Sequence, residues 1–85
     1  MSYDVRLMPR AQKDLERFRA KLHDKFEALI LGLYDNPRPH NAKKLLGGGS
    51  QWRIRSGNYR ILYELDEERK IVKVYRIAHR KEAYR

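Results

Sequence analysis

The chain has 85 residues, the length of one small domain, and no apolar run approaches the roughly 20 residues that a membrane span needs. It has no cysteine, which excludes disulfides and thiolate zinc sites. Lys plus Arg (20) exceeds Asp plus Glu (11), so the formal charge is +9 and an anionic partner is expected, whether nucleic acid, acidic protein or membrane surface. We expect one cytoplasmic domain over residues 1–85 without a signal peptide, because Asp4 and Arg6 interrupt the apolar N-terminus.

The first half of the chain predicts a strand and two helices. Apolar residues alternate with others over residues 3–8, which indicates a strand. Pro9 suits the first turn of a helix, because its missing N–H would be unpaired there. Asp24 followed by Glu27 resembles a capping box at the start of a second helix, which the following proline-rich segment ends. Residues 9–36 therefore predict a helical hairpin with one apolar face per helix.

The second half predicts a loop and three strands. Residues 41–50 contain three consecutive glycines but lack the lysine–serine pair of a P-loop, so we interpret them as a flexible connector. Strands are expected over residues 51–55, 59–65 and 70–77, joined by short turns as an antiparallel meander. The predicted fold class is α+β: an antiparallel sheet with the helical hairpin packed on one face, in the order β-α-α-β-β-β.

Basic residues gather where acidic ones are absent, from residue 36 to residue 63. Arg53 and Arg55 should project from one face of a strand, and Arg60 lies across a short turn from them. Arg80 follows the last strand and should emerge near the same patch. Several guanidiniums on one spot can clamp a phosphate and stabilise a phosphoryl transition state. The other candidate RNA contacts are Lys43, Lys44, Arg55, Lys81 and Arg85.

Tyr84 and His79 are candidates for stacking on a base or moving a proton. RNA cleavage needs no metal, since the 2′-OH attacks the adjacent phosphate and the protein has only to align groups, neutralise charge and assist proton transfer. No histidine stands at a familiar metal-ligand spacing, so no metal or other cofactor is expected. Solvated arginines and packed aromatic residues are the ordinary alternative, and the patch alone would equally support an RNA-binding module without catalysis.

Two long segments of the sequence resemble a known family. The segments W-R-I-R-S-G-N-Y-R-I-L-Y-E-L and V-K-V-Y-R-I-A-H-R-K-E-A-Y-R resemble RelE-type toxins of the RelE/ParE superfamily, and the similarity extends over nearly the whole chain. The resemblance implies a ribosome-dependent endoribonuclease that cuts mRNA to a 2′,3′-cyclic phosphate and a 5′-hydroxyl. It also implies an acidic antitoxin that blocks the toxin, with operator DNA bound only through the toxin–antitoxin complex.

The resemblance also implies roles for single residues. Arg60 and Arg80 match transition-state arginines, and Tyr84 matches a tyrosine that stacks on the substrate base and assists proton transfer. Arg53 falls where some members have a catalytic lysine, and Gln51 where they have a second basic residue. Because neither side chain readily accepts a proton, the general base is left open between the histidine and the tyrosine of the tail. The alternative within the superfamily is a ParE-like inhibitor of DNA gyrase.

Overall fold

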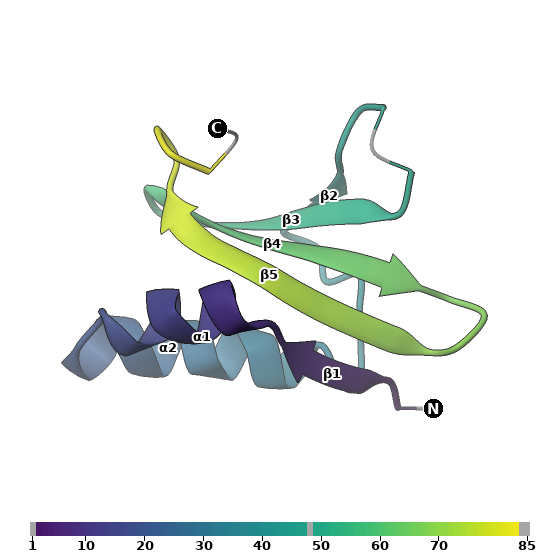
Figure 1. The fold of residues 1–85 in the computed structure, drawn as a ribbon, viewed down its shortest axis with the longest axis horizontal. Helices are drawn as coiled ribbons and strands as arrows, with labels where there is room; N and C mark the ends of the chain where they lie inside the picture. The colour runs from purple at the N-terminus through teal and green to yellow at the C-terminus, as the bar shows by residue number, and fades with distance from the viewer. Residues whose placement is uncertain (1, 48, 84–85) are drawn as a thin grey trace.

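A five-stranded sheet and two helices make up the computed structural model, which describes residues 2–47 and 49–83 (Figure 1). The helices lie against one face of the sheet, and the loop after β2 and the C-terminal turn lie on the opposite side (Figure 1). The elements in chain order are β1 (Asp4–Leu7), α1 (Pro9–Glu16), α2 (Ala20–Gly32), β2 (Ala42–Lys44), β3 (Gln51–Ser56), β4 (Tyr59–Asp66) and β5 (Ile71–His79).

The predicted α+β fold class and the meander are confirmed, since β3, β4 and β5 are consecutive antiparallel neighbours. Two details differ from the prediction. The sheet is mixed, because β1 pairs in parallel with β5 after the helices carry the chain across. Part of the predicted loop forms β2, which pairs with β3; its three residues carry no strand signal of their own and depend on that neighbour.

The break between the helices is earlier than predicted. Helix α1 begins at Pro9 as expected, but α2 begins at Ala20, and Asp24 lies inside it, so the predicted capping box is wrong. The break is fixed by packing: the ring of Phe18, between the helices, meets Phe26 edge-on with centroids 4.8 Å apart and Tyr59 at 5.2 Å. A contact between the segment that joins the helices and a distant strand leaves no local pattern in the sequence.

The core lies between the helices and one face of the sheet. Its largest member is Tyr63, fully buried, whose hydroxyl donates to the carbonyl of Pro37 at 2.6 Å. Burial raises the pKa of Tyr63, because the phenolate would lose its hydration. The other buried apolar residues of this cluster include Ala11, Leu15, Phe26, Ile30, Leu33, Ile54, Ile61, Val72, Val74 and Ile77.

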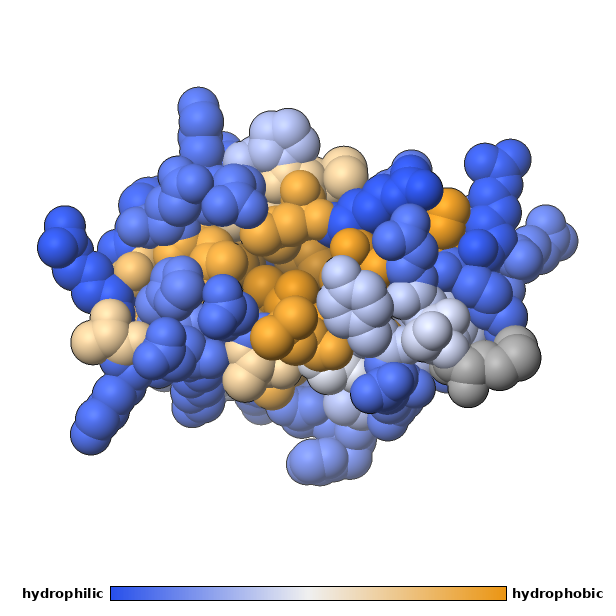
Figure 2. All heavy atoms as spheres, turned by 90° about the horizontal axis from the view of Figure 1, so that it is seen from below, coloured by the Kyte–Doolittle hydropathy of each residue, from blue (hydrophilic) through white to orange (hydrophobic). Residues whose placement is uncertain are grey.

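The surface on the helix side carries an apolar hollow surrounded by hydrophilic side chains (Figure 2). Leu31 of α2 is 56% exposed, and Tyr34, just after α2, is exposed as well. Neither described helix has the length and apolar character needed to cross a membrane.

A bulge in β5 decides which residues face away from the helices. Ile77 is opposite Ile61 and Val74 is opposite Tyr63, so Tyr75 is an extra residue in the ladder. Side-chain direction alternates along a strand, and the extra residue switches that alternation. Ile77 consequently points into the core. Arg76 is directly opposite Leu62 at the edge of β5, where its Nε reaches Asp14 of α1.

Candidate nucleic-acid interface

The face of the sheet opposite the helices, which we call the open face, is basic. Arg53 and Arg55 flank the buried Ile54 on β3 and therefore point away from the core. Arg55 is directly opposite Arg60 on β4, and Arg53 is directly opposite Lys43 on β2. Directly opposed side chains have Cβ atoms about 5 Å apart. The structure therefore brings together four of the residues predicted from the sequence.

Arg60 is the most constrained of these cations. It is only 6% exposed, and its Nη1 donates to the carbonyl oxygens of Tyr59 at 2.9 Å and Gly57 at 3.3 Å. Gly57 has a φ of +58°, the left-handed conformation that places its carbonyl within the β3–β4 turn. Over residues 2–47 and 49–83, no carboxylate forms an ion pair with Arg60. A buried guanidinium bonded only to neutral groups favours an approaching anion.

A shallow depression of about 240 Å³ lies beside these arginines. His40, Asn41, Lys43, Arg53 and Arg55 line it. The Asn41 amide donates to the carbonyl of Arg55 at 3.4 Å, which holds the segment before β2 against β3. Three cations around a small concavity suit a phosphate group. His40 and Asn41 were not among the predicted site residues, because their position depends on the unpredicted strand β2.

The C-terminal turn lies over the same face, as expected. The backbone N–H of Arg80 donates to the carbonyl of Asn58 at 2.7 Å, which anchors the turn beside the β3–β4 turn. Ala83 is buried against Leu62 and Ala78, both on the open face. The side chains of Arg80 and Lys81 are exposed. Tyr84 and Arg85 lie outside the described residues.

Two predicted site residues are not brought to the open face. His79 is opposite Tyr59, and their rings meet edge-on with centroids 5.5 Å apart on the helix side of the sheet. Its Nδ1 accepts a hydrogen bond from the backbone N–H of Lys81 at 3.3 Å. Lys44 is opposite Trp52, whose side chain packs against the core. The β5 bulge explains the position of His79, and the alternation of β2 explains that of Lys44.

Among residues 2–47 and 49–83, the other end of the sheet offers no comparable anion site. A cavity of about 440 Å³ at the β4–β5 hairpin has four carboxylates and four cations in its lining. These are Glu64, Asp66, Glu67 and Glu68, together with Arg6, Lys44, Arg69 and Lys73. Because these charges cancel, this end suits phosphate less well than the end that carries Arg60 and the C-terminal turn.

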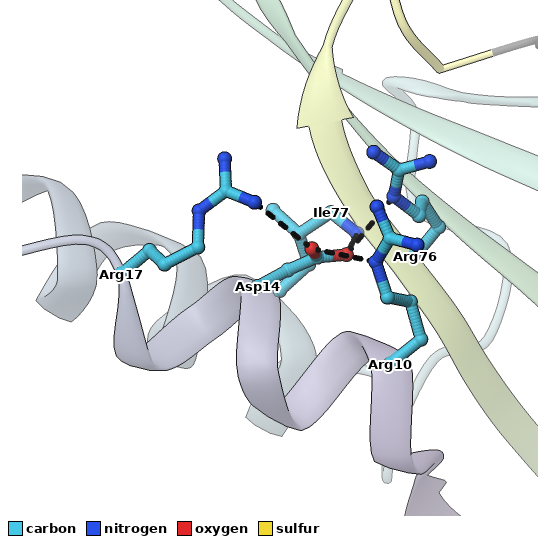
Figure 3. Close-up of polar contacts among 5 residues, drawn as sticks. All are labelled: Arg10, Asp14, Arg17, Arg76 and Ile77. Carbon is cyan, nitrogen blue, oxygen red and sulfur yellow. Dashed lines mark hydrogen bonds and ion pairs between the residues drawn. The ribbon is translucent and has the colours of Figure 1, made fainter.

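A buried carboxylate on α1 holds the last part of β5 (Figure 3). Asp14 is 1% exposed and accepts from the backbone N–H of Ile77 at 2.9 Å, from Arg76 Nε at 3.1 Å and from Arg10 Nε at 3.2 Å. Arg17 Nη1 lies 3.8 Å away. Pairing between β1 and β5 ends at Val74, so the edge of β5 beyond that residue has no neighbouring strand. Asp14 supplies the acceptor that the Ile77 backbone N–H would otherwise lack.

Asp14 was not among the site residues predicted from the sequence. Its one available signal was an aspartate beside Ala11 and Leu15 on the apolar side of α1. A polar residue at such a position often has a specific buried partner, but the partner could not be read from the sequence.

In the part of the chain that the structure describes, one group of side chains has ligand atoms close enough together to contact a metal ion. Ligand atoms of His23, Asp24 and Glu27 lie within 4.8 Å of one another on α2. The histidine and the glutamate stand four residues apart, and neither was among the predicted site residues. The two carboxylates are exposed, as acidic side chains commonly are without any ion, so the group is not evidence of a metal site.

Comparison with known proteins adds family information to this geometry. The model of a family described as the ParE toxin of the type II toxin–antitoxin system parDE matches residues 5–84. A curated protein of Methanocaldococcus jannaschii named "Putative toxin RelE1" is 31% identical over 88 residues, covering 100% of this chain and 98% of that protein.

Solved structures of toxin–antitoxin complexes share the fold. The archaeal RelE–RelB complex from Pyrococcus horikoshii OT3 contains a chain with a TM-score of 0.84 and 26% identity, covering 98% of this chain and 100% of that one. The toxin–antitoxin complex RelBE2 from Mycobacterium tuberculosis contains a chain with a TM-score of 0.79 and 26% identity, covering 93% of this chain and 99% of that one.

Proposed function

This chain belongs to the ParE toxin family of type II toxin–antitoxin systems, within the RelE/ParE superfamily, and from that premise we propose that it is an mRNA-cleaving toxin. The observation that carries the proposal is the arginine cluster of the open face. Arg60 is held by two backbone carbonyls, Arg53 and Arg55 stand beside it, and no carboxylate of the described chain pairs with any of the three. We propose residues 1–85 as one toxin domain that acts in the cytoplasm on mRNA held by the ribosome.

The proposed reaction is cleavage of RNA by its own 2′-hydroxyl. A bond forms between the 2′-oxygen and phosphorus, and the bond from phosphorus to the 5′-oxygen breaks. The 2′-hydroxyl loses its proton to a base, and the 5′-oxygen gains one. Arg53, Arg60 and Arg80 would neutralise the extra negative charge of the pentacoordinate phosphorus. The other proposed RNA contacts, Lys43, Arg55, Lys81 and Arg85, would bind flanking phosphates.

In the proposed reaction, a residue of the C-terminal segment transfers the proton. Arginine stays protonated in proteins and is a poor base, so Tyr84 or His79 is the proposed proton carrier. His79 packs against Tyr59 on the helix side, and this position favours Tyr84 for contact with the substrate. If Tyr84 is the proton carrier, Tyr84→Phe abolishes cleavage and His79→Gln retains it, which product formation in single-turnover reactions would measure.

An inhibitor of DNA gyrase remains the alternative, because the family model carries the ParE name. An RNA-binding module without catalysis would use the same basic surface. The nuclease is favoured by the buried arginine, since a surface that only attracts nucleic acid gains little from fixing one guanidinium through backbone carbonyls. Preorganised charge of this kind is worth most when negative charge develops during a reaction.

The proposed partner is an acidic antitoxin. The relatives from Pyrococcus and Mycobacterium were solved as toxin–antitoxin complexes. A net charge of +9 attracts an acidic chain, and a partly disordered one could fold over the surface as it binds. Burying the apolar hollow of the helix side would add a contribution that does not depend on salt (Figure 2).

The test is a primer-extension map of a reporter mRNA in a translating extract. Discrete new 5′ ends within the reading frame, lost with Arg60→Ala or Arg80→Ala, are the expected result. Lys25→Ala, an exposed cation of α2, is the matched control and should cut normally. Continued translation without new ends contradicts the nuclease, and inhibition of DNA supercoiling by the same preparation would then identify the gyrase alternative.

A further inference from the structure

We propose that Arg76 is a further phosphate-binding residue of the open face and that Asp14 is its positioning residue. The nature of the ligand, an RNA strand, rests on the function proposed above. Arg76 was not among the predicted site residues. The bulge at Tyr75 switches the alternation of β5 and sets Arg76 opposite Leu62, at the β5 edge of the open face, where its Nε bonds Asp14 of α1.

The pairing of four strands sets Arg76 in line with the other cations. Lys43 is opposite Arg53, Arg53 is opposite Leu62, and Leu62 is opposite Arg76. Neighbouring strands lie about 4.8 Å apart, so the backbones at Arg76 and Arg53 are roughly 10 Å apart across the sheet. Both side chains are long enough to contact one segment of a nucleic-acid backbone that crosses the strands.

The hydrogen bonds of Arg76 leave its terminal nitrogens available. Its Nε donates to Asp14 at 3.1 Å, and its side chain is 17% exposed. Figure 3 shows its two terminal nitrogens turned away from Asp14. They donate to no other group of the described residues. Arginine binds phosphate best through such a fixed pair of N–H groups, because less rotamer entropy is lost on binding.

Asp14 does not neutralise this arginine. Its single negative charge is shared with Arg10 and Arg17 as well as Arg76, which leaves an excess of two positive charges. Asp14 also accepts from the backbone of Ile77 and would remain satisfied without Arg76. The carboxylate therefore orients Arg76, whereas Arg76 is not needed to satisfy the carboxylate.

Salt-dependent binding of a single-stranded RNA oligonucleotide to the purified full chain tests the proposal. Each phosphate contact contributes about 0.7 to the slope of log K against log salt for single strands. Arg76→Met should lower that slope by about 0.7 and weaken binding by about 5- to 10-fold at physiological salt. Arg17→Ala also loses a contact with Asp14, but from an exposed position at the C-terminal end of α1, and should keep the wild-type slope.

The Asp14→Asn variant tests whether Asp14 acts on RNA binding by positioning Arg76. It keeps an oxygen acceptor for Ile77, and it should weaken RNA binding in the wild-type background but have no further effect in the Arg76→Met background. A folded Arg76→Met protein with the wild-type slope overturns the proposal, as does an equal effect of Asp14→Asn in both backgrounds. If the wild type cuts mRNA but Arg76→Met binds RNA as tightly as the wild type, only the proposed role of Arg76 is wrong. If the wild type neither binds nor cuts RNA, both the role of Arg76 and the proposed function are wrong.

Discussion

Replacing Asp14 by alanine should destabilise the protein more than any surface substitution, because one buried carboxylate satisfies several donors. Without it, the backbone N–H of Ile77 loses its acceptor on a buried stretch of β5, which costs about 1–3 kcal/mol. The largely buried Arg76 also loses its carboxylate, and breaking a buried pair from one side costs about 3–5 kcal/mol. These contributions overlap, so we expect a total loss of about 3–5 kcal/mol.

That loss is large for a chain of this length, whose free energy of unfolding should be about 4–13 kcal/mol. Urea unfolding followed by circular dichroism measures it, with the midpoint expected to fall and the m-value to stay constant. Asp14→Asn keeps an oxygen acceptor for Ile77 and should lose only about 1–2 kcal/mol. Arg17→Ala removes a contact that is 3.8 Å long and mostly exposed, so it should change stability by less than about 0.5 kcal/mol.

Amide hydrogen exchange gives the local readout. The Ile77 amide should exchange faster in Asp14→Ala than in Asp14→Asn, whereas amides in the β3–β4 pair should change only with global stability. If Asp14→Ala unfolds within 1 kcal/mol of wild type at an unchanged m-value, with Ile77 still protected, the carboxylate does not hold the edge of β5 and this reasoning is refuted.

Three further predictions concern the core, the β3–β4 turn and the open face. Tyr63→Phe loses the bond to Pro37 and should cost about 1–2 kcal/mol in thermal unfolding. Burial raises the pKa of Tyr63 in the folded protein, so the tyrosine of the unfolded chain ionises first as the pH rises above about 10. The free energy of unfolding of the wild type should therefore decline above that pH, and the Phe variant should lack this part of the decline. Gly57→Ala places a side chain at φ +58° and should cost about 1–2 kcal/mol in urea, whereas Gly32→Ala in α2 should be neutral or stabilising. Arg55→Ala should lower RNA affinity and its salt slope, and Lys44→Ala, which removes an equal charge from the helix side, should change neither.

Local periodicity determined most of the fold in advance. The alternating residues 51–55 predicted that Arg53 and Arg55 share a face, and pairing across a short turn brought Arg60 to the same face. Pro9 marked the start of α1, because a residue without an N–H fits there and not later. These features depend on neighbours along the chain, so the sequence alone was enough to predict them.

Contacts between distant residues decided the rest. Phe18 sets the helix break by packing on a strand, β2 exists through its pairing with β3, and Asp14 meets a backbone N–H that lies 63 residues away. The bulge at Tyr75 exchanges the faces of Arg76 and His79, because one extra residue reverses a two-residue alternation. Local alternation of residues was therefore enough to predict that a basic sheet face exists. Which arginines and which tail residues reach that face depends on the tertiary structure, because strand register is set by pairing across the sheet.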